Sequence, residues 1–473
     1  MSPSAAAMRR ASALVASLAL ASAHAASLDP VRAARIDADV QAILARTHTP
    51  GAVVAVVQDG RVVFRKAYGL RDRERGLAVD TGTPFEIGSI TKQFTAAAIL
   101  QLQEAHALDI DARLATILPD APHADEVTLR QLLSHTSGLP EYLEGDDVEA
   151  WASKPHAFDE IIARVAGKPL VFAPGSRMAY CNTGYVLLGR VIEVVSHQRY
   201  RDYVRTHLLR RAGMTHTATV ADEPRLAGMA VGYRVRDGRA ERAPSIDDSV
   251  GGAAGHLVST VDDMIRWSRA LARGEIVGDA SYRLMSTATP LAEGSADYGL
   301  GLFVDRVRDQ PRIGHTGGSF GFTSANEFFP AQRVRLVALT NNTTSPEPGE
   351  TITNAIFDDL FPAIAAAADT PAADEPAPVT ARIKALFDGV QHDRVDATTL
   401  APKLAAKMQA GLAHRLAALF APYGAPTRTL YKGTRTERGL EWYDYVLAFG
   451  PGSRLAFSIG LDEVGRIASL SYG

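Results

Sequence analysis

The sequence lacks most of the features that mark metal, disulfide-bonded, nucleic-acid and membrane proteins. Its single cysteine, Cys181, has no partner for an intramolecular disulfide and cannot build a cysteine-based metal site. No cluster of histidine and acidic residues has metal-ligand spacing. A net charge of −3 gives no basic footprint for nucleic acid, and beyond the N-terminus no apolar run is long enough to span a membrane. We therefore expect no cofactor, metal, nucleic acid or membrane span; the oligomeric state stays open.

The first 25 residues carry the three parts of a cleavable secretory signal. Arg9 and Arg10 form the positive region, residues 11–21 form a short apolar region, and an A-x-A cleavage site ends at Ala25. We predict a signal peptide over residues 1–25, a cut after Ala25 and a periplasmic or secreted mature protein. An amphipathic N-terminal helix is the alternative, and the completeness of the three-part pattern argues against it.

The rest of the chain is long enough for one large domain and a smaller one. Apolar spacing in the first part predicts a helix, a hairpin, a long helical stretch, three further strands and a closing helix. The ranges are 30–46, 52–57 with 61–68, 89–284, then 312–316, 322–329 and 334–340, and 351–360. We therefore predict an α+β fold in which helices flank one antiparallel sheet and a helical lobe leaves a cleft beside it.

The composition changes after Phe361. Residues 365–378 form an Ala/Pro/acidic run without periodicity, which indicates a linker. Helical spacing and then strand alternation return in residues 379–473, which predicts a small α+β accessory domain. The main domain is accordingly predicted over residues 26–364. The accessory domain has no catalytic pattern; it either binds a partner or covers the lobe.

Ser89 and Lys92 form a Ser-x-x-Lys motif at the start of a predicted helix. Three residues apart on a helix, the two side chains share a face. A serine hydroxyl needs a nearby base to become a nucleophile, and a desolvated lysine can serve. A helix N-terminus also favours developing negative charge. The motif alone is a weak signal, because a solvent-facing serine and lysine at a helix start give the same sequence.

Tyr180-Cys181-Asn182 is the second motif. Alternate residues on an extended segment point the same way, so a phenol and an amide can face one cleft. The phenol would then act as acid or base and the amide as a hydrogen-bonding group. A plainer interpretation makes Asn182 the N-cap of a helix over 185–195, with Tyr180 packed beneath it. The two interpretations are compatible.

The third motif is Gly314-His315-Thr316-Gly317-Gly318, in a strand-like context. Glycines let a substrate approach the backbone closely. A substrate peptide can also pair along such a strand as an added edge. His315 considered alone is more simply an ordinary strand histidine.

Taken in order, Ser-x-x-Lys, Tyr-x-Asn and His-Thr-Gly resemble the serine β-lactamase and penicillin-binding protein superfamily. The run LLSHTSGL, from Leu132 to Leu139, is similar to a signature of its class C-like branch, and the run from Gly252 to Thr260 resembles another segment of that branch. The resemblance spans roughly residues 29–361. It implies a β-lactamase-like fold and a mechanism that passes through an acyl-enzyme.

The resemblance also implies a role for each matching residue. Ser89 would be acylated by the substrate carbonyl, and Lys92 and Tyr180 would share the proton transfer, with the identity of the general base left open. The backbone N–H groups of Ser89 and Gly318 would form the oxyanion hole. The implied substrate-binding residues are Asn182, His315, Thr316 and Gly317.

One position departs from typical β-lactamases of this type, which have lysine where this chain has His315. A neutral imidazole binds a carboxylate less well than an ammonium, and the histidine form resembles certain D,D-peptidases and D-aminopeptidases. We therefore expect an exported serine hydrolase that acts on a D-amino-acid peptide, a peptidoglycan fragment or an ester. The alternatives are a β-lactamase, or a penicillin-binding sensor with little turnover.

A rival nucleophile is Ser319, because residues 317–321 match Gly-x-Ser-x-Gly. That nucleophile elbow requires a strand, a sharp turn and a helix, and the residues after Ser319 predict a strand instead. His135 lies directly beside Ser134 in the chain, but neighbours in sequence do not make a triad. We expect His135 to be a structural group in a turn.

Overall fold

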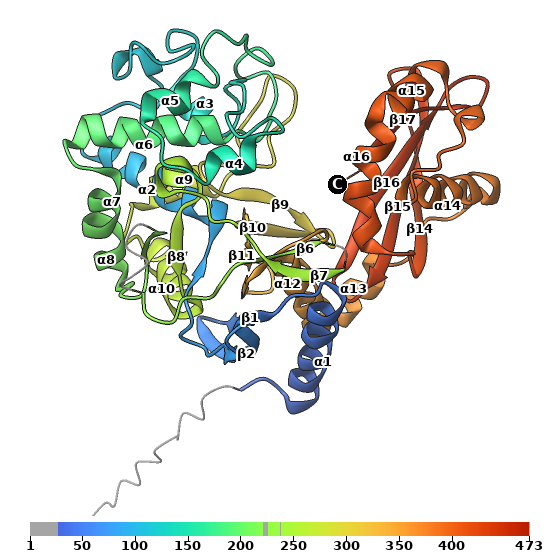
Figure 1. Cartoon of the computed structure of the whole chain (residues 1–473), viewed down its shortest axis with the longest axis horizontal. Coiled ribbons are helices and arrows are strands. Elements are labelled where there is room, and N and C mark those ends of the chain that lie inside the picture. Colours follow the sequence, from blue (N-terminus) through green and yellow to red (C-terminus); the bar gives the residue numbers. More distant parts are fainter. Residues whose placement is uncertain (1–26, 221–225, 237, 473) are drawn as a thin grey trace, which may run out of the picture.

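The computed structural model describes residues 27–220, 226–236 and 238–472 (Figure 1). The predicted signal peptide and its cleavage site lie outside these residues. Within the described ranges, each helix is too short or too polar to cross a membrane. The chain forms a main domain and, in orange to red in Figure 1, a C-terminal domain beside it.

A seven-stranded antiparallel sheet forms the centre of the main domain, in the order β3-β2-β1-β12-β11-β10-β9. The first three strands precede the helical lobe in sequence and the other four follow it, so β1 pairs with β12 across a large separation. The strands are β1 (Gly51–Gln58), β2 (Arg61–Asp72), β3 (Leu77–Ala78), β9 (Phe303–Val307), β10 (Gln310–Ser319), β11 (Phe322–Phe329) and β12 (Val334–Thr340).

Strand β1 is a continuous apolar run because both faces of the sheet are covered. Alternate residues of a strand point to opposite faces. Val53 and Ala55 belong to the core shared with α2 and α10, whereas Val54 and Val56 belong to the core shared with α1 and α12. These helices are α1 (Pro30–Arg46), α2 (Thr91–Glu104), α10 (Val261–Ala272) and α12 (Pro348–Leu360).

The helical lobe is inserted between β3 and β9 and packs on the α2 side of the sheet (Figure 1). Two small three-stranded sheets, β4-β8-β5 and β13-β6-β7, accompany it. Its helices are η1 (Gly88–Ile90), η2 (Leu114–Thr116), α3 (Leu129–Leu133), α4 (Val148–Ala152), α5 (Phe158–Ala163), α6 (Asn182–Ser196), α7 (Tyr200–Tyr203), η3 (Val204–Leu209), α8 (Arg210–Ala212), α9 (Asp248–Gly255) and α11 (Asp279–Met285). The short strands are β4 (Phe85–Glu86), β5 (Ala218–Thr219), β6 (Tyr233–Arg236), β7 (Arg239–Arg242), β8 (Leu257–Ser259) and β13 (Asn342–Thr343).

The C-terminal domain is a four-stranded antiparallel sheet packed against helices around its own apolar core. Its strands are β14 (Arg428–Glu437), β15 (Leu440–Gly450), β16 (Ser453–Leu461) and β17 (Ile467–Tyr472). Its helices are α14 (Ala377–Gln391), η5 (Ala397–Thr399), α15 (Pro402–Lys407), η6 (Met408–Leu412), α16 (Ala413–Phe420) and η7 (Ala421–Tyr423).

The linker is shorter than the range 365–378 expected from composition. Helix α13 (Pro362–Ala368) takes in the alanine run, and α14 already begins at Ala377. Alanine has the highest helix propensity and proline is favoured in the first helical turn, so this segment forms helix without an apolar period. Residues 369–376 therefore make up the connection between the two helices.

The two domains are also joined by direct packing. Gly452, in the turn before β16, has a φ of 64°, and a Cβ atom there would meet the carbonyl oxygen of Thr351 in α12 at 1.9 Å. Arg454 forms ion pairs with Asp358 of α12 and with Asp369. The C-terminal domain therefore stabilises the helix that covers one face of the main sheet.

The α+β class, the antiparallel sheet and the separate C-terminal domain are confirmed. The helix predicted over 30–46 and the strands over 322–329 and 334–340 match α1, β11 and β12. Strands β9, β14 and β17 escape prediction, and each lies at the edge of its sheet. Edge strands are partly exposed on both faces and so lack strong apolar alternation.

Candidate active site

Ser89 lies where the short turn η1 passes into helix α2. The preceding Gly88 has a φ of 49°, and a Cβ atom there would lie 2.7 Å from the backbone nitrogen of Gly318. Only glycine allows this approach. The contact sets the start of α2 against the end of β10, so the backbone N–H groups of Ser89 and Gly318, expected to bind an oxyanion, belong to neighbouring segments.

Lys92 follows one turn later and is fully buried. Its Nζ donates hydrogen bonds to Ser89 Oγ at 3.0 Å, to Asn182 Oδ1 at 2.8 Å and to the carbonyl oxygen of Ala254 at 2.6 Å. Burial lowers the pKa of Lys92 to about 7, although nearby Glu141 opposes the shift. A neutral amine is therefore accessible near neutral pH, within reach of the serine hydroxyl.

Tyr180 approaches the same pair of residues. The centre of its ring lies 4.8 Å from Lys92 Nζ. Its hydroxyl oxygen is buried and makes no hydrogen bond of good geometry within the described residues, yet Ser89 is close enough to interact with it. Burial raises the pKa of Tyr180 well above its usual value, and the interaction with Ser89 opposes that rise. The phenol is therefore protonated at neutral pH and is able to donate or relay a proton.

Asn182 is the first residue of α6 and not its N-cap, which corrects the plainer of the two interpretations of this motif. Cys181 occupies the cap position, with an extended backbone at φ −147° and no capping hydrogen bond from its side chain. The Asn182 amide is instead engaged by Lys92 through Oδ1. The structure thus brings Ser89, Lys92, Tyr180 and Asn182 together in one site, from two elements far apart in sequence.

Glu141 is a residue of the site that sequence reasoning missed. Its Oε2 accepts hydrogen bonds from the backbone nitrogen of Asn182 at 2.6 Å and from Asn182 Nδ2 at 3.1 Å. These two bonds fix which way the amide points, with the carbonyl oxygen toward Lys92. The sequence feature that could have pointed to Glu141 is its position two residues after the LLSHTSGL run.

His315 is turned into the protein. It is 2% exposed, its Nδ1 bonds to the carbonyl oxygen of Thr316, and its Nε2 lies 2.8 Å from the Tyr298 hydroxyl. A carbonyl only accepts, so Nδ1 carries the proton and Nε2 accepts from the phenol. Burial lowers the pKa of His315 to about 3, and Lys92 adds to the effect. The imidazole is uncharged at neutral pH and therefore supplies no positive charge for a substrate carboxylate.

The last part of β10 has one free edge. Strand β11 pairs with β10 as far as Ser319, whereas β9 pairs with it only from Gln310 to Gly314. Among the described residues, the segment from His315 to Gly318 is therefore unpaired on the β9 side, which leaves an edge to which an extended substrate can bond. At Gly317 the face of the strand is closed, because a Cβ atom there would meet the carbonyl oxygen of Ile87 at 2.0 Å.

His135 lies behind Tyr180, in the turn expected for it. Its φ is 58°, its Nδ1 accepts a hydrogen bond from the backbone nitrogen of Cys181, and its ring centre lies 4.1 Å from that of Tyr180. Burial and the neighbouring Lys92 hold the pKa of His135 well below its ordinary value. The neutral ring therefore packs Tyr180 in place.

Ser319 does not sit on a nucleophile elbow. It ends β10, and a short turn leads directly into strand β11. Its hydroxyl donates to Glu86 Oε2 at 2.7 Å in a buried position. The strand–turn–helix context that would expose a catalytic serine is absent around this residue.

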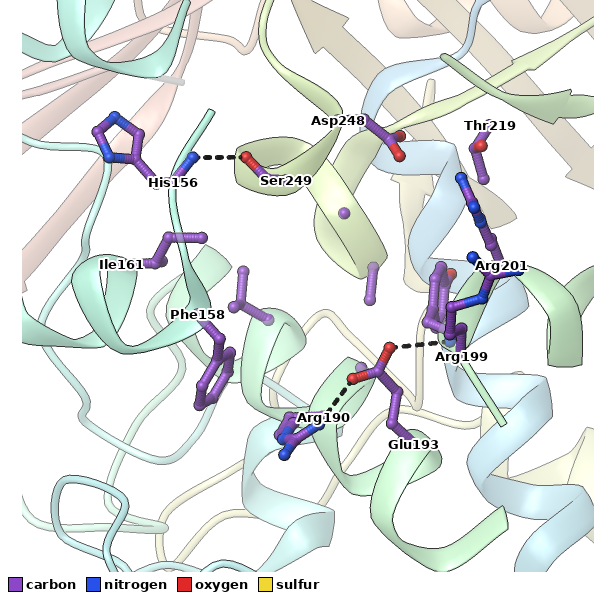
Figure 2. A pocket seen from close by; sticks show the side chains of 15 residues that line it. His156, Phe158, Ile161, Arg190, Glu193, Arg199, Arg201, Thr219, Asp248 and Ser249 are labelled. Carbon is purple, nitrogen blue, oxygen red and sulfur yellow. Dashed lines mark hydrogen bonds and ion pairs between the residues drawn. The ribbon is translucent and has the colours of Figure 1, made fainter. Parts of the chain in front are cut away.

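A hollow of about 350 Å³ lies between α5, α6, α7 and α9 (Figure 2), and Ser89, Lys92, Tyr180 and Asn182 do not line it. Its charged walls are largely paired, as Arg190 with Glu193 and Arg199 with Asp202. It adjoins the α9 backbone next to the carbonyl that binds Lys92. Within the described ranges, no three His, Cys, Asp or Glu residues are grouped to hold a metal ion.

Known proteins match most of the main domain. The family model described as Beta-lactamase matches residues 36–360. The putative penicillin-binding protein PbpX of Bacillus subtilis (strain 168) is 29% identical over 303 residues, which cover 64% of this chain and 73% of that protein.

Solved structures extend the likeness. A D-stereospecific amidohydrolase from Streptomyces sp. superposes with a TM-score of 0.57 at 26% identity, covering 65% of this chain and 94% of that one. The octameric penicillin-binding protein homologue from Pyrococcus abyssi superposes with a TM-score of 0.62 at 22% identity, covering 91% of this chain and 96% of that one. This second likeness concerns the fold alone, and it includes most of the C-terminal domain.

Proposed function

The chain belongs to the beta-lactamase family, and we propose that it is a serine hydrolase that forms an acyl-enzyme on Ser89 with an amide or ester substrate. The observation that carries the proposal is the hydrogen bond from the buried Lys92 Nζ to Ser89 Oγ at 3.0 Å. A lysine desolvated enough to lose its proton near neutral pH is the base that a serine nucleophile requires.

In the proposed reaction, Ser89 Oγ attacks the substrate carbonyl while its proton passes to the neutral Lys92 Nζ, either directly or through the Tyr180 hydroxyl, which takes up that proton as it gives its own to Lys92. The carbonyl oxygen becomes an anion between the N–H groups of Ser89 and Gly318. The bond to the leaving group then breaks, and the same proton is returned to that group. Attack by water on the ester, with the proton path reversed, frees the acid and restores Ser89.

For the substrate, we propose a D-amino-acid amide, a D-amino-acid peptide, a peptidoglycan fragment or an ester ahead of a β-lactam. Two observations support this order. The similar Streptomyces protein is described as a D-stereospecific amidohydrolase, and His315 is buried and uncharged where a β-lactamase would offer a cation. A β-lactamase and a penicillin-binding sensor with slow deacylation are the competing functions.

Intact-mass spectrometry tests the proposal. The protein is incubated separately with benzylpenicillin, D-phenylalanine amide and p-nitrophenyl acetate, and turnover of each is followed in parallel. We expect a covalent adduct or turnover that is lost in Ser89→Ala and retained in Ser319→Ala. Turnover that survives Ser89→Ala and disappears in Ser319→Ala would reverse the assignment, and persistent penicillin adducts without ester turnover would favour the sensor.

We further propose that the protein is exported and cut after Ala25, on the strength of the three-part N-terminal pattern. N-terminal sequencing of protein recovered from the periplasm should begin at Ala26. Uncleaved protein confined to the cytoplasm would reject this part of the proposal.

A further inference from the structure

Glu347 is an unpaired carboxylate next to the candidate active site. It immediately precedes α12, and its side chain does not cap that helix. Within the described residues its side chain makes no hydrogen bond and no ion pair. Its side chain is open to solvent. A carboxylate held against a protein surface without a partner loses hydration and gains nothing in return, so the position is suited to an incoming cation.

The carboxylate faces the segment proposed to bind the oxyanion. A Cβ atom built on Gly318 would lie 3.8 Å from Glu347 Oε1. Apart from Gly318 itself and the residues on either side of it, no other atom of the described residues would be nearer. Glu347 also acts on Tyr180: burial is the main cause of the raised pKa of that phenol, and the charge of Glu347 adds to it. The carboxylate therefore lies near both Gly318 and Tyr180, two of the residues proposed to act on the substrate.

The charged groups around Glu347 leave it without a cation. The surrounding protein desolvates the Glu347 carboxylate in part, although the side chain still reaches solvent, and this raises its pKa to about 7; Glu350 of α12 adds to the rise. Arg312, the cation that pairs with Glu350 of the same helix, is also bound to Glu327 and Asp305.

The C-terminal domain contributes to the same surroundings. Tyr423 of η7 interacts with Ser345, which lies two residues before Glu347, and burial raises the pKa of Tyr423 with smaller contributions from Glu350 and Glu347. A phenol and a second carboxylate supply no positive charge. A bound cation would restore favourable electrostatics at this position.

We propose that Glu347 determines specificity by selecting substrates that carry a free α-ammonium next to the scissile carbonyl. The α-ammonium is the cation nearest to the reacting bond of an amino-acid amide, and Gly318 places that bond beside the carboxylate. The same charge repels substrates that present a carboxylate at this place. This inference rests on the proposed acyl transfer at Ser89 and names the substrate class for that site.

The test is a series of three p-nitroanilides that differ in charge: D-alanine p-nitroanilide, its N-acetyl derivative and its N-succinyl derivative. We expect kcat/KM to fall in that order, with the cationic and anionic members separated by about tenfold or more. Glu347→Gln should collapse this ratio toward one, and Glu347→Lys should invert the order. Glu463→Gln removes the same charge from an exposed residue of the C-terminal domain and should leave the ratio as in the wild type.

The outcomes separate this inference from the function on which it rests. If Ser89 is acylated by p-nitrophenyl acetate but neither Glu347 variant changes the ratio, Glu347 does not select charge and only this inference fails. If the wild-type protein turns over no substrate and Ser89 is not acylated, the proposed function fails and the inference falls with it. Circular dichroism of both variants establishes that a changed ratio is not caused by misfolding.

Discussion

Glu141 Oε2 accepts both the backbone N–H and the side-chain N–H of Asn182, at 2.6 and 3.1 Å. The amide is thereby fixed, and its carbonyl oxygen is the part that remains for Lys92. Glu141 also opposes the fall in the pKa of Lys92 that burial causes. Glu141 therefore fixes Asn182, which contacts the proposed base Lys92, and its charge also acts to raise the pKa of Lys92.

We predict that Glu141→Gln lowers kcat/KM about tenfold, because a charge-assisted hydrogen bond is replaced by a neutral one. Removing the negative charge should also lower the pKa of Lys92 further, so the pH–rate profile should move toward lower pH. Glu144→Gln, an exposed change in the same loop, serves as the control. A reduced rate with an unshifted profile would limit Glu141 to a structural role.

The pH dependence of acylation should report on Lys92 itself. Burial lowers its pKa to about 7, and only the neutral amine accepts the Ser89 proton. The rate of acylation should therefore be low on the acid side, rise through about pH 7 and level off above it. Single-turnover acylation with an uncharged ester, measured from pH 5 to 9 (roughly two units either side of that pKa), checks this. A rate that is flat across this range would exclude a titrating lysine as the base.

The sequence predicts the local part of this site and misses the tertiary part. Ser89 and Lys92 sit one helical turn apart, and Tyr180 and Asn182 two residues apart, so spacing alone places each pair on one side of the chain. The bonds of Asn182 to Glu141, and of His315 to Tyr298, join segments that only the fold brings together. No rule of residue spacing reveals these bonds. The bond to Tyr298 holds the His315 ring in its buried position.

Lys92 and Tyr180 should behave as one unit. Both contact Ser89 and lie next to each other, so each single change removes a group that handles the same proton. We predict that Lys92→Ala and Tyr180→Phe each lower kcat strongly and change the melting temperature little. The kcat of the double variant should be only slightly lower than that of the more damaging single variant. Double-variant kinetics alongside thermal melts measure this. A loss equal to the product of the two single losses would mean that the two residues act independently.

The last prediction concerns the C-terminal domain. Ser89, Lys92, Tyr180 and Asn182 all precede this domain, and the domain has an apolar core of its own. A truncated protein that ends near Phe361 should therefore fold and still acylate Ser89, with a lower melting temperature because α12 loses its contacts with Gly452 and Arg454. Selectivity among charged substrates should weaken too, since the loop that carries Glu347 loses its contact with Tyr423.

Gly452→Ala in the full-length chain provides the matched control for that truncation. Gly452 has a φ of 64°, and a Cβ atom there would lie 1.9 Å from the Thr351 carbonyl oxygen. An added methyl group must therefore push the two domains apart, while both domains remain present. Like the truncation, this variant should lower the melting temperature, and Ser89 should still be labelled covalently. Labelling by p-nitrophenyl acetate, followed by intact mass, is the deciding measurement. A truncated protein that is well folded by circular dichroism but cannot be acylated would show that residues beyond Pro378 complete the active site.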